Sequence, residues 1–345
     1  MGDESTHVRK IRDHVIPRVA DLRKIWHPEW FQGRKKRKNY FEGWYMKHVS
    51  SPGDSVLSFI PGISLNKQEP HAFVQVIKGD TGDTWYFRFP AEAFSYASNA
   101  FDIRIGKNRF SQKGICVDLQ YEGESISGEI SYANPHHFPV SLKTPGIMGW
   151  YRYVPLMQCY HGLVSMDHDL QGSIRVNSKI HDFSKGKGYV EKDWGSSMPE
   201  AWIWMQSNHF SRERTSMMLS IARIPWLGSS FPGFLGFLLH EGKELYFATY
   251  TGAKIKTLEI SQTEVFCTIE GKDFLLHIHG ARESSPEGKG ALKAPGKGNM
   301  ERVIHESVNA VLHIRLTNKK GELIFEGTGT HAGLEMIGEA ALLQS

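Results

Sequence analysis

Two acids and a phenol recur at alternate positions in the segment Gly188-Tyr189-Val190-Glu191-Lys192-Asp193-Trp194-Gly195. In an extended chain Tyr189, Glu191 and Asp193 share one face. Neighbouring carboxylates raise one another's pKa, and burial raises it further, so such a pair can keep a proton near neutral pH and donate it. The alternative is an ordinary ion pair between Lys192 and one of the acids. The residue types alone leave both interpretations open.

A tryptophan-rich segment follows, Trp202-Ile203-Trp204-Met205-Gln206-Ser207-Asn208-His209-Phe210. Alternation places its two tryptophans on one strand face together with Gln206 and Asn208. Desolvated indole faces stabilise a cation by about 2 kcal/mol. An acid beside such rings suits protonation of an alkene and protection of the carbocation that results. Ordinary packing of the tryptophans in a core is the alternative.

A third acid is flanked by aromatic residues in Tyr40-Phe41-Glu42-Gly43-Trp44-Tyr45. Alternation puts Glu42 and Trp44 on one face and Phe41 and Tyr45 on the other. Glu42 is a candidate catalytic acid, because burial among rings raises the pKa of a carboxyl group that lacks compensating partners. The slightly favoured alternative is a structural glutamate bound to a backbone amide or a cation across the floor of a barrel.

Other catalytic fingerprints are missing from the sequence. It contains neither a Gly-x-Gly-x-x-Gly motif, nor a Gly-Lys-Ser/Thr phosphate loop, nor a Gly-x-Ser-x-Gly nucleophile elbow. The pairs His136/His137 and His277/His279 lack a third ligand at a defined spacing. We therefore expect neither a metal nor a cofactor.

Composition narrows the class of protein. The 41 basic and 37 acidic residues nearly balance, which argues against a nucleic-acid partner. The three cysteines lie far apart in the sequence, which favours a reducing, cytoplasmic location. The polar N-terminus lacks the apolar region of a secretory signal. The basic run 34–38 and the apolar window 224–239, which is too short to span a bilayer, leave transient membrane contact open.

Short β-rich runs separated by Gly, Asn and Asp turns begin at Tyr40, and their spacing predicts an all-β fold of sandwich or barrel type. A weak helical pattern over residues 15–26 predicts one short N-terminal helix. The proline-rich stretch 134–155 is interpreted as a crossover. We thus expect an approach segment (1–39), a first β-unit (40–155) and a second β-unit (156–345).

The segments quoted above resemble the tocopherol cyclase family. So do Met157-Gln158-Cys159-Tyr160-His161-Gly162, Ile224-Pro225-Trp226, Ala248-Thr249-Tyr250-Thr251-Gly252-Ala253 and Ala332-Gly333-Leu334-Glu335. The resemblance runs from about His27 to Gly338. It implies two tandem lipocalin-like antiparallel β-barrels, akin to carotenoid hydratases and lipocalin-like Diels–Alder enzymes. The plant members carry a plastid-targeting extension, so this chain is expected to be a bacterial-type member.

The resemblance also implies a reaction, in which a phenol oxygen adds to a protonated prenyl double bond and closes a ring. Asp193 is then the first choice for the acid, before Glu191 and Glu42. The implied ligand is a prenylated or polyprenyl lipid. The residues expected to bind it are Trp44, Tyr45, Tyr160, His161, Tyr189, Trp202, Trp204, Gln206, Asn208 and His209.

Two other functions compete with this isoprenoid cyclase. A non-catalytic lipid-binding protein of lipocalin type would have its acids locked to Lys192 or to an arginine, whereas an enzyme would present them to the cavity. A β-sandwich carbohydrate module would explain exposed tryptophans but not the resemblance along nearly the whole chain.

Overall fold

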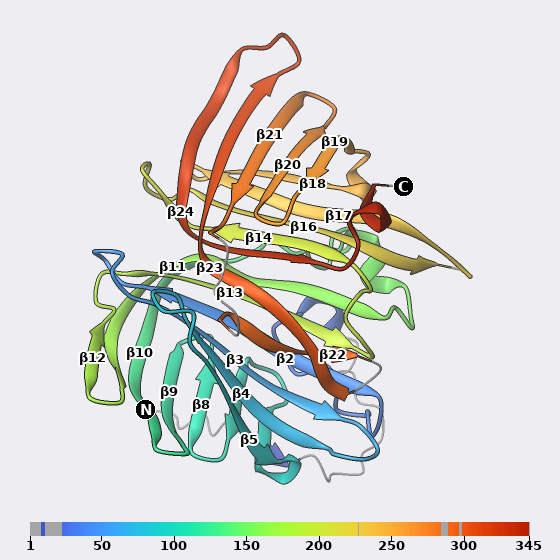
Figure 1. Cartoon of the computed structure of the whole chain (residues 1–345). Helices are drawn as coiled ribbons and strands as arrows, with labels where there is room; N and C mark the ends of the chain where they lie inside the picture. The colour runs from blue at the N-terminus through green and yellow to red at the C-terminus, as the bar shows by residue number, and fades with distance from the viewer. Residues whose placement is uncertain (1–7, 11–22, 227, 284–288, 297–298, 345) are drawn as a thin grey trace, which may run out of the picture.

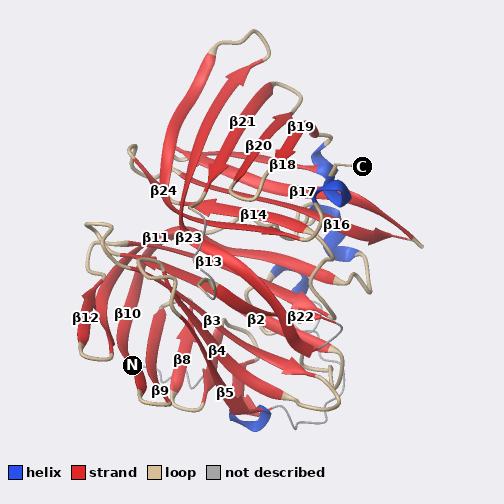
Figure 2. Ribbon diagram, in the orientation of Figure 1, coloured by secondary structure: helices blue, strands red, loops and turns tan. Residues whose placement is uncertain are grey.

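The computed structural model of the chain describes residues 8–10, 23–226, 228–283, 289–296 and 299–344. Its regular secondary structure is almost entirely β-strand, arranged in two antiparallel sheets that lie one above the other (Figures 1 and 2). The helical elements of the described residues are short 3-10 helices, namely η1 (Lys24–Trp26), η2 (Ala91–Ala93), η3 (Gly149–Tyr153), η4 (Thr249–Thr251) and η5 (Ala340–Leu343). Of the helix expected over residues 15–26, the part 15–22 lies outside the described residues.

The first sheet contains thirteen strands of the described chain and curves into a nearly closed barrel, the lower half of Figure 1. Its order is β1-β6-β7-β8-β9-β10-β11-β13-β2-β3-β4-β5, with β12 paired to β11. The strands are β1 (Val8–Lys10), β2 (Tyr40–Val49), β3 (Val56–Leu65), β4 (His71–Lys78), β5 (Thr84–Pro90), β6 (Phe94–Ala97), β7 (Asp102–Ile105), β8 (Asn108–Ser111), β9 (Gly114–Tyr121), β10 (Glu124–His136), β11 (Cys159–Val176), β12 (Lys179–Asp182) and β13 (Lys187–Gly195).

The second sheet contains eleven strands of the described chain, in the order β18-β17-β16-β14-β24-β23-β21-β20-β19, with β15 paired to β24 and β22 to β23. The strands are β14 (Trp202–Ser207), β15 (His209–Phe210), β16 (Ser216–Trp226), β17 (Ser229–His240), β18 (Lys243–Ala248), β19 (Lys254–Ile260), β20 (Glu264–Glu270), β21 (Phe274–Ala281), β22 (Ala291–Gly296), β23 (Asn299–Asn318) and β24 (Leu323–Ile337). The predicted class, two tandem lipocalin-like antiparallel β-units, is confirmed.

The chain passes from the first sheet to the second between Gly195 and Trp202. Strands β11 and β13 belong to the first sheet, because β11 pairs with β10 and β13 pairs with β2. The boundary predicted at 155/156 therefore does not coincide with the change of sheet, and the division into domains itself stays a prediction. The hairpin β22–β23 reaches back toward the first sheet, where Gln75 hydrogen-bonds both backbone groups of Lys293.

Three apolar cores follow from this arrangement. One fills the barrel of the first sheet, a second lies within the second sheet, and a third lies between the sheets. Strand β2 is buried along nearly its whole length, so both of its faces pack against protein. Residues that alternate along β2 and β13 therefore enter two different environments, the barrel interior and the space between the sheets.

Candidate active site

An apolar cavity with a volume of about 200 Å³ lies between the two sheets. Both sheets and the segments joining them contribute to its wall. Aromatic and methionine side chains dominate the lining, together with three acids and one histidine. The lining includes Phe41, Tyr45, Phe73, Met148, Tyr151, Met157, Tyr160, His161, Glu191, Asp193, Met198, Trp202, Trp204, Phe231, Phe234, Tyr250, Met300, Ile304 and Glu335.

Strand register brings three of the polar groups together on the first sheet. Asp193 of β13 lies directly opposite His161 of β11 on one side and Gly43 of β2 on the other. Two residues earlier along β13, Glu191 lies opposite Tyr45. Because direct cross-strand partners project from the same face of a sheet, all of these side chains enter the cavity wall.

Glu191 is the most buried acid of this cluster, with 4% of its surface exposed. Its Oε2 accepts hydrogen bonds from the Tyr189 hydroxyl at 2.5 Å and the Trp204 indole at 3.1 Å. Burial raises the pKa of Glu191 to about 7, against the lowering effect of His161 and of these two donors. At neutral pH this carboxyl group is therefore divided between its protonated and ionised forms.

His161 connects the two acids. Its Nδ1 lies 2.9 Å from Asp193 Oδ1, and its Nε2 lies 3.5 Å from Glu191 Oε2. Burial by itself would lower the pKa of His161, but the two neighbouring carboxylates outweigh it and raise that pKa to about 9. The imidazole is thus held as a cation between Asp193 and Glu191, so Asp193 serves as its anionic partner.

The second sheet supplies the indole wall. Trp202 and Trp204 both project into the cavity from β14, and the ring of Tyr45 meets that of Trp204 edge to face at 5.1 Å. Gly333 of β24 makes room for Trp204, because a Cβ atom at position 333 would lie only 2.4 Å from the indole Cζ3. Trp204 and Tyr45 therefore lie directly beside Glu191 in the cavity wall.

Two further acids escaped the sequence reasoning, Glu306 and Glu335. They are direct cross-strand partners on β23 and β24, and Glu335 lines the cavity. Burial raises the pKa of Glu335 to about 7 and raises that of Glu306 well above its ordinary value. A signal for Glu306 was present in the sequence, since it occupies an inward position of an alternating strand between Ile304 and Val308.

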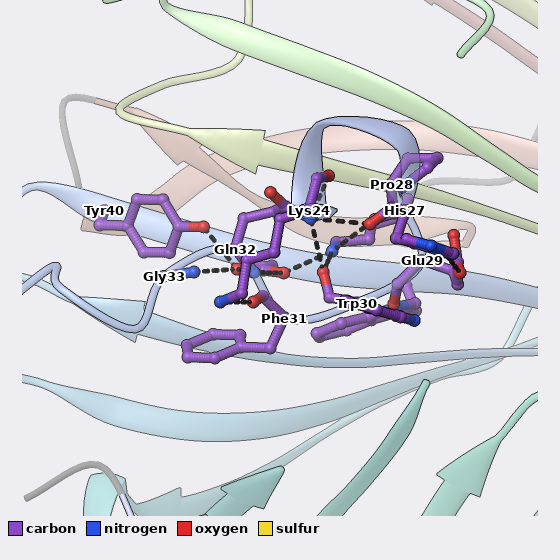
Figure 3. A network of polar contacts seen from close by, with 12 residues as sticks. Lys24, His27, Pro28, Glu29, Trp30, Phe31, Gln32, Gly33 and Tyr40 are labelled. Carbon is purple, nitrogen blue, oxygen red and sulfur yellow. Dashed lines mark hydrogen bonds and ion pairs between the residues drawn. The ribbon is translucent and has the colours of Figure 1, made fainter. Parts of the chain in front are cut away.

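Glu42 does not line the cavity, so the structure does not bring this candidate acid together with Glu191 and Asp193. It projects from the opposite face of β2 and forms an ion pair of 2.5 Å with Lys192, both side chains being fully buried. The amides of Gln32 and Gly33 and the Tyr40 hydroxyl also donate to its carboxylate. Figure 3 shows the Gly33 amide and the Tyr40 hydroxyl aimed at the same point. The alternative interpretation, a structural glutamate bound to amides and a cation, describes Glu42.

Lys192 is saturated by the same network. Its ammonium also donates to the carbonyl oxygens of Pro28 and Trp30, at 2.8 and 2.5 Å, and it lies over the rings of Trp44 and Trp194. Lys192 therefore does not pair with Glu191 or Asp193. The ion pair expected of a purely lipid-binding protein is not formed by this lysine.

The remaining expected ligand contacts divide into two groups. Tyr45, Tyr160, His161, Trp202 and Trp204 line the cavity, and Tyr189 lies behind Glu191. Trp44 stacks on Phe101 in the barrel core instead. Gln206, Asn208 and His209 follow the tryptophans in the chain and do not line the cavity. Their side chains contact other protein groups instead. Gln206 contacts Lys47, Asn208 contacts Asp167 and Gly188, and His209 contacts Asn208.

The cluster of His161, Glu191 and Asp193 also has the composition of a cation site, with one atom from each within 4.8 Å of the others. One oxygen of each carboxylate already takes part in a hydrogen bond, whereas His161 Nε2 has no hydrogen-bond partner among the described residues. Asp193 Oδ1 faces the imidazole Nδ1, and Glu191 Oε2 accepts from Tyr189 and Trp204. A metal ion bound through these two oxygens would have to displace the donors, so the contacts to the carboxylates favour a proton-bearing cluster.

Fold and site together define a class of protein. The chain is a β-barrel protein with an apolar, acid-containing cavity of a size for a small molecule. The sequence profile of the family described as tocopherol cyclase-like matches residues 110–338, and the chain belongs to this family. The resemblance drawn from the sequence motifs is thereby confirmed. No helix among the described residues is long and apolar enough to cross a membrane.

Two curated plant proteins are similar in sequence. A probable chloroplastic tocopherol cyclase of Oryza sativa subsp. japonica is 25% identical over 211 residues, which are 58% of this chain and 44% of the rice protein. The chloroplastic tocopherol cyclase of Zea mays is also 25% identical over 211 residues, 43% of its length. The match thus takes in less than half of each relative. The crystal structure of CghA with Sch210972 covers 94% of both chains with a TM-score of 0.57 and 10% identity, a likeness of fold alone.

Proposed function

We propose that this protein is an isoprenoid cyclase of the tocopherol cyclase type, an intramolecular lyase or isomerase that protonates a prenyl double bond and closes a ring. The observation that carries the proposal is Glu191, a carboxyl group with a raised pKa in an apolar, indole-lined cavity. A carboxylic acid that remains partly protonated at neutral pH is the donor that alkene protonation requires.

Glu191 replaces Asp193 as the first choice for the acid. Its described hydrogen bonds end on Oε2, which leaves Oε1 to carry the proton. Asp193 is bound to His161 and holds the imidazolium in place. Asp193 and His161 therefore position Glu191 and set its pKa, while Glu191 reacts.

The reaction divides into two steps. Glu191 transfers its proton to one carbon of the prenyl double bond, which leaves a tertiary cation on the other carbon and a carboxylate on the protein. The indoles of Trp202 and Trp204 and the ring of Tyr45 line the cavity around the cation. A hydroxyl oxygen of the same molecule then forms the C–O bond and gives up its proton, so the product is an isomer of the substrate.

The names of the two curated relatives and the apolar lining of the cavity support a prenylated or polyprenyl lipid as the ligand. The alternative function is a lipid-binding protein without chemistry, which the apolar cavity supports equally well. The acids separate the two functions. A carrier has no need of a buried, partly protonated carboxyl group, and burying one lowers the stability of the fold.

Transient contact with a membrane surface is part of the proposal, because such a lipid dissolves in bilayers. Leu142 and Leu156 are 77% and 93% exposed, and Trp150 is 47% exposed. They belong to the segment that contributes Met148, Tyr151 and Met157 to the cavity wall. Co-sedimentation with anionic phospholipid vesicles should fall when both leucines are changed to serine, and equal sedimentation would refute membrane contact through this segment.

The proposed function is tested by incubating the protein with 2-methyl-6-phytylbenzoquinol and with polyprenylated hydroquinones. Wild type should form a cyclised product, and Glu191→Gln should lose at least a hundredfold in rate while still binding the lipid. Glu129→Gln, a change of the same kind at an exposed position of β10, is the matched control. Lipid that is bound and returned unchanged by wild type would establish the carrier.

A further inference from the structure

The second acid pair of the molecule has no place in alkene protonation by Glu191. Glu306 and Glu335 are direct partners on β23 and β24, so their side chains leave the same face of the sheet. Neither forms an ion pair with a lysine or arginine within the part of the chain that the structure describes. The pair Glu42–Lys192 shows how this fold neutralises a buried carboxylate when its role is structural.

Each carboxyl group of the pair is held by one aromatic donor. The Tyr45 hydroxyl lies 2.5 Å from Glu306 Oε1, and the Trp202 indole lies 2.5 Å from Glu335 Oε2. Glu306 is only 2% exposed, and its Oε2 has no hydrogen-bond partner among the described residues. Glu335 is the member that opens on the cavity.

The two members of the pair differ in charge. Two carboxylates at direct cross-strand positions repel each other, so in an apolar site one retains a proton. Glu306 is the member that retains the proton, because its pKa is raised further than that of Glu335. Burial and the neighbouring Glu335 raise the pKa of Glu306, whereas Lys47 and Tyr45 lower it. Glu335 is therefore the member of the pair that ionises first as the pH rises, near Arg282 and also near Glu191 and Asp193 of the opposite wall.

Glu335 and Glu191 thus face one cavity from different sheets, and Trp204 lies between them. Trp204 is the cross-strand partner of Glu335 and hydrogen-bonds Glu191 through its indole. A molecule in the cavity meets a proton donor on one wall and a proton acceptor on the other. An acceptor at this position suits a hydroxyl group, which donates one hydrogen bond.

We propose that Glu335, with Glu306 behind it, is the site that binds the nucleophilic hydroxyl group of a phenol-type ligand and accepts its proton. The catalytic part of this inference rests on the proposed function. The hydroxyl O–H donates to Glu335; when the oxygen forms its bond to the carbocation, the O–H bond breaks and the proton passes to the carboxylate. Glu191 gave one proton and Glu335 received one, so solvent exchange restores both groups without net consumption.

The binding part is tested with a ligand that cannot react. Dodecylhydroquinone carries a saturated chain, and its dimethyl ether lacks the hydroxyl donors; quenching of tryptophan fluorescence reports the binding of each. Wild type should bind the hydroquinone at least about tenfold more tightly than the ether. Glu335→Gln should lose most of that preference, while Glu326→Gln, at an exposed position of the same strand, should retain it.

A second variant keeps the test valid if Glu335→Gln does not fold. Glu335→Asp keeps the charge and withdraws it by one methylene group, and it should show an intermediate preference. Equal binding of hydroquinone and ether by wild type would overturn the proposal. Full retention of the preference in both Glu335 variants would overturn it as well.

Reaction of a prenylated hydroquinone in D₂O separates this inference from the proposed function. In Glu335→Gln we expect deuterium in the prenyl chain and isomerised alkene with little ring closure, because the cation forms but is poorly captured. Normal ring closure in this variant would remove Glu335 from the reaction and leave the cyclase in place. A wild type that incorporates no deuterium but keeps a Glu335-dependent preference for the hydroxyl would refute the cyclase and retain the binding site.

Discussion

Trp204 of the second sheet donates its indole N–H to Glu191 of the first sheet across a distance of 3.1 Å. One hydrogen bond therefore fixes the acid relative to the aromatic wall that would surround a cation. The same indole is the cross-strand neighbour of Glu335. The proposed chemistry thus depends on how the two sheets are stacked, and not on either sheet alone.

The pH dependence of the rate should follow the protonated form of Glu191. Because its pKa is raised to about 7, kcat should decline above that pH as Glu191 ionises. At lower pH the protonation of Glu335, whose pKa is also raised to about 7, should limit capture of the cation instead. The cationic His161 lowers the pKa of Glu191, so His161→Gln should raise that pKa and move the decline to higher pH. Rate profiles of both proteins between pH 5 and 9 check this. A rate that increases through pH 7 would mean that the ionised form is the active one.

Gly333→Ala should displace Trp204. The added methyl group would lie 2.4 Å from the indole Cζ3, too close for the ring to remain where it is. We expect a loss of about 1–3 kcal/mol in the free energy of unfolding, together with a lower rate as the hydrogen bond to Glu191 breaks. Gly296→Ala is the control, because its methyl group would meet nothing closer than 3.9 Å. Urea unfolding and product formation measure the two effects, and an unchanged rate would show that Trp204 need not keep its place.

The ion pair Glu42–Lys192 should behave as a structural unit. Glu42→Gln or Lys192→Met alone leaves one buried charge without its partner and should cost about 3–5 kcal/mol of unfolding free energy. The double variant should cost clearly less than the sum of the two, which a double-mutant cycle of urea unfolding would reveal. Additive losses would contradict a direct interaction. Glu42 would regain a catalytic role only if Glu42→Gln folded normally and lost its activity.

The raised pKa of Glu335 makes the fold sensitive to pH. A carboxyl group with a pKa of 4.5 in the unfolded chain and about 7 in the folded protein binds protons more tightly when folded. Its contribution is therefore complete below about pH 4.5 and is lost as the pH rises through 7, a change of at most about 3 kcal/mol. Glu335→Gln should flatten the decline in Tm between pH 5 and 8. An equally steep decline in the variant would show that other groups cause it.

The sequence predicted the all-β class and the alternation of faces, because turn residues and period-two patterns are local properties. Alternation correctly grouped Glu191 with Asp193, and Trp202 with Trp204. It could not decide which face of β2 meets the cavity, since both faces are buried and only the pairing with β13 places Tyr45 beside Glu191.

Other parts of the site depend on contacts between distant segments. Glu306 and Glu335 become a pair through the register of β23 with β24. The partner of Lys192 could not be chosen from the sequence for a similar reason, because Glu42 and the carbonyl oxygens of residues 28 and 30 approach it only in the folded chain. Gln206, Asn208 and His209 lie on or directly after the strand that carries the tryptophans, but beyond the end of the cavity, and a strand pattern does not define where a cavity ends.

Strand β13 presents Glu191 and Asp193 on one face and Lys192 on the other, and it pairs with β2 without interruption from Lys187 to Gly195. A slip of one residue would turn Lys192 toward the cavity and insert acids into the barrel beside Glu42. The ion pair in the barrel core therefore favours the correct register of the strand. A misaligned chain would place two carboxylates next to each other away from water, and their repulsion would destabilise it. The same register of β13 thus determines both the folding of the barrel and the position of the acid. In a chain whose barrel has closed with this ion pair, Glu191 already lies on the side of the cavity.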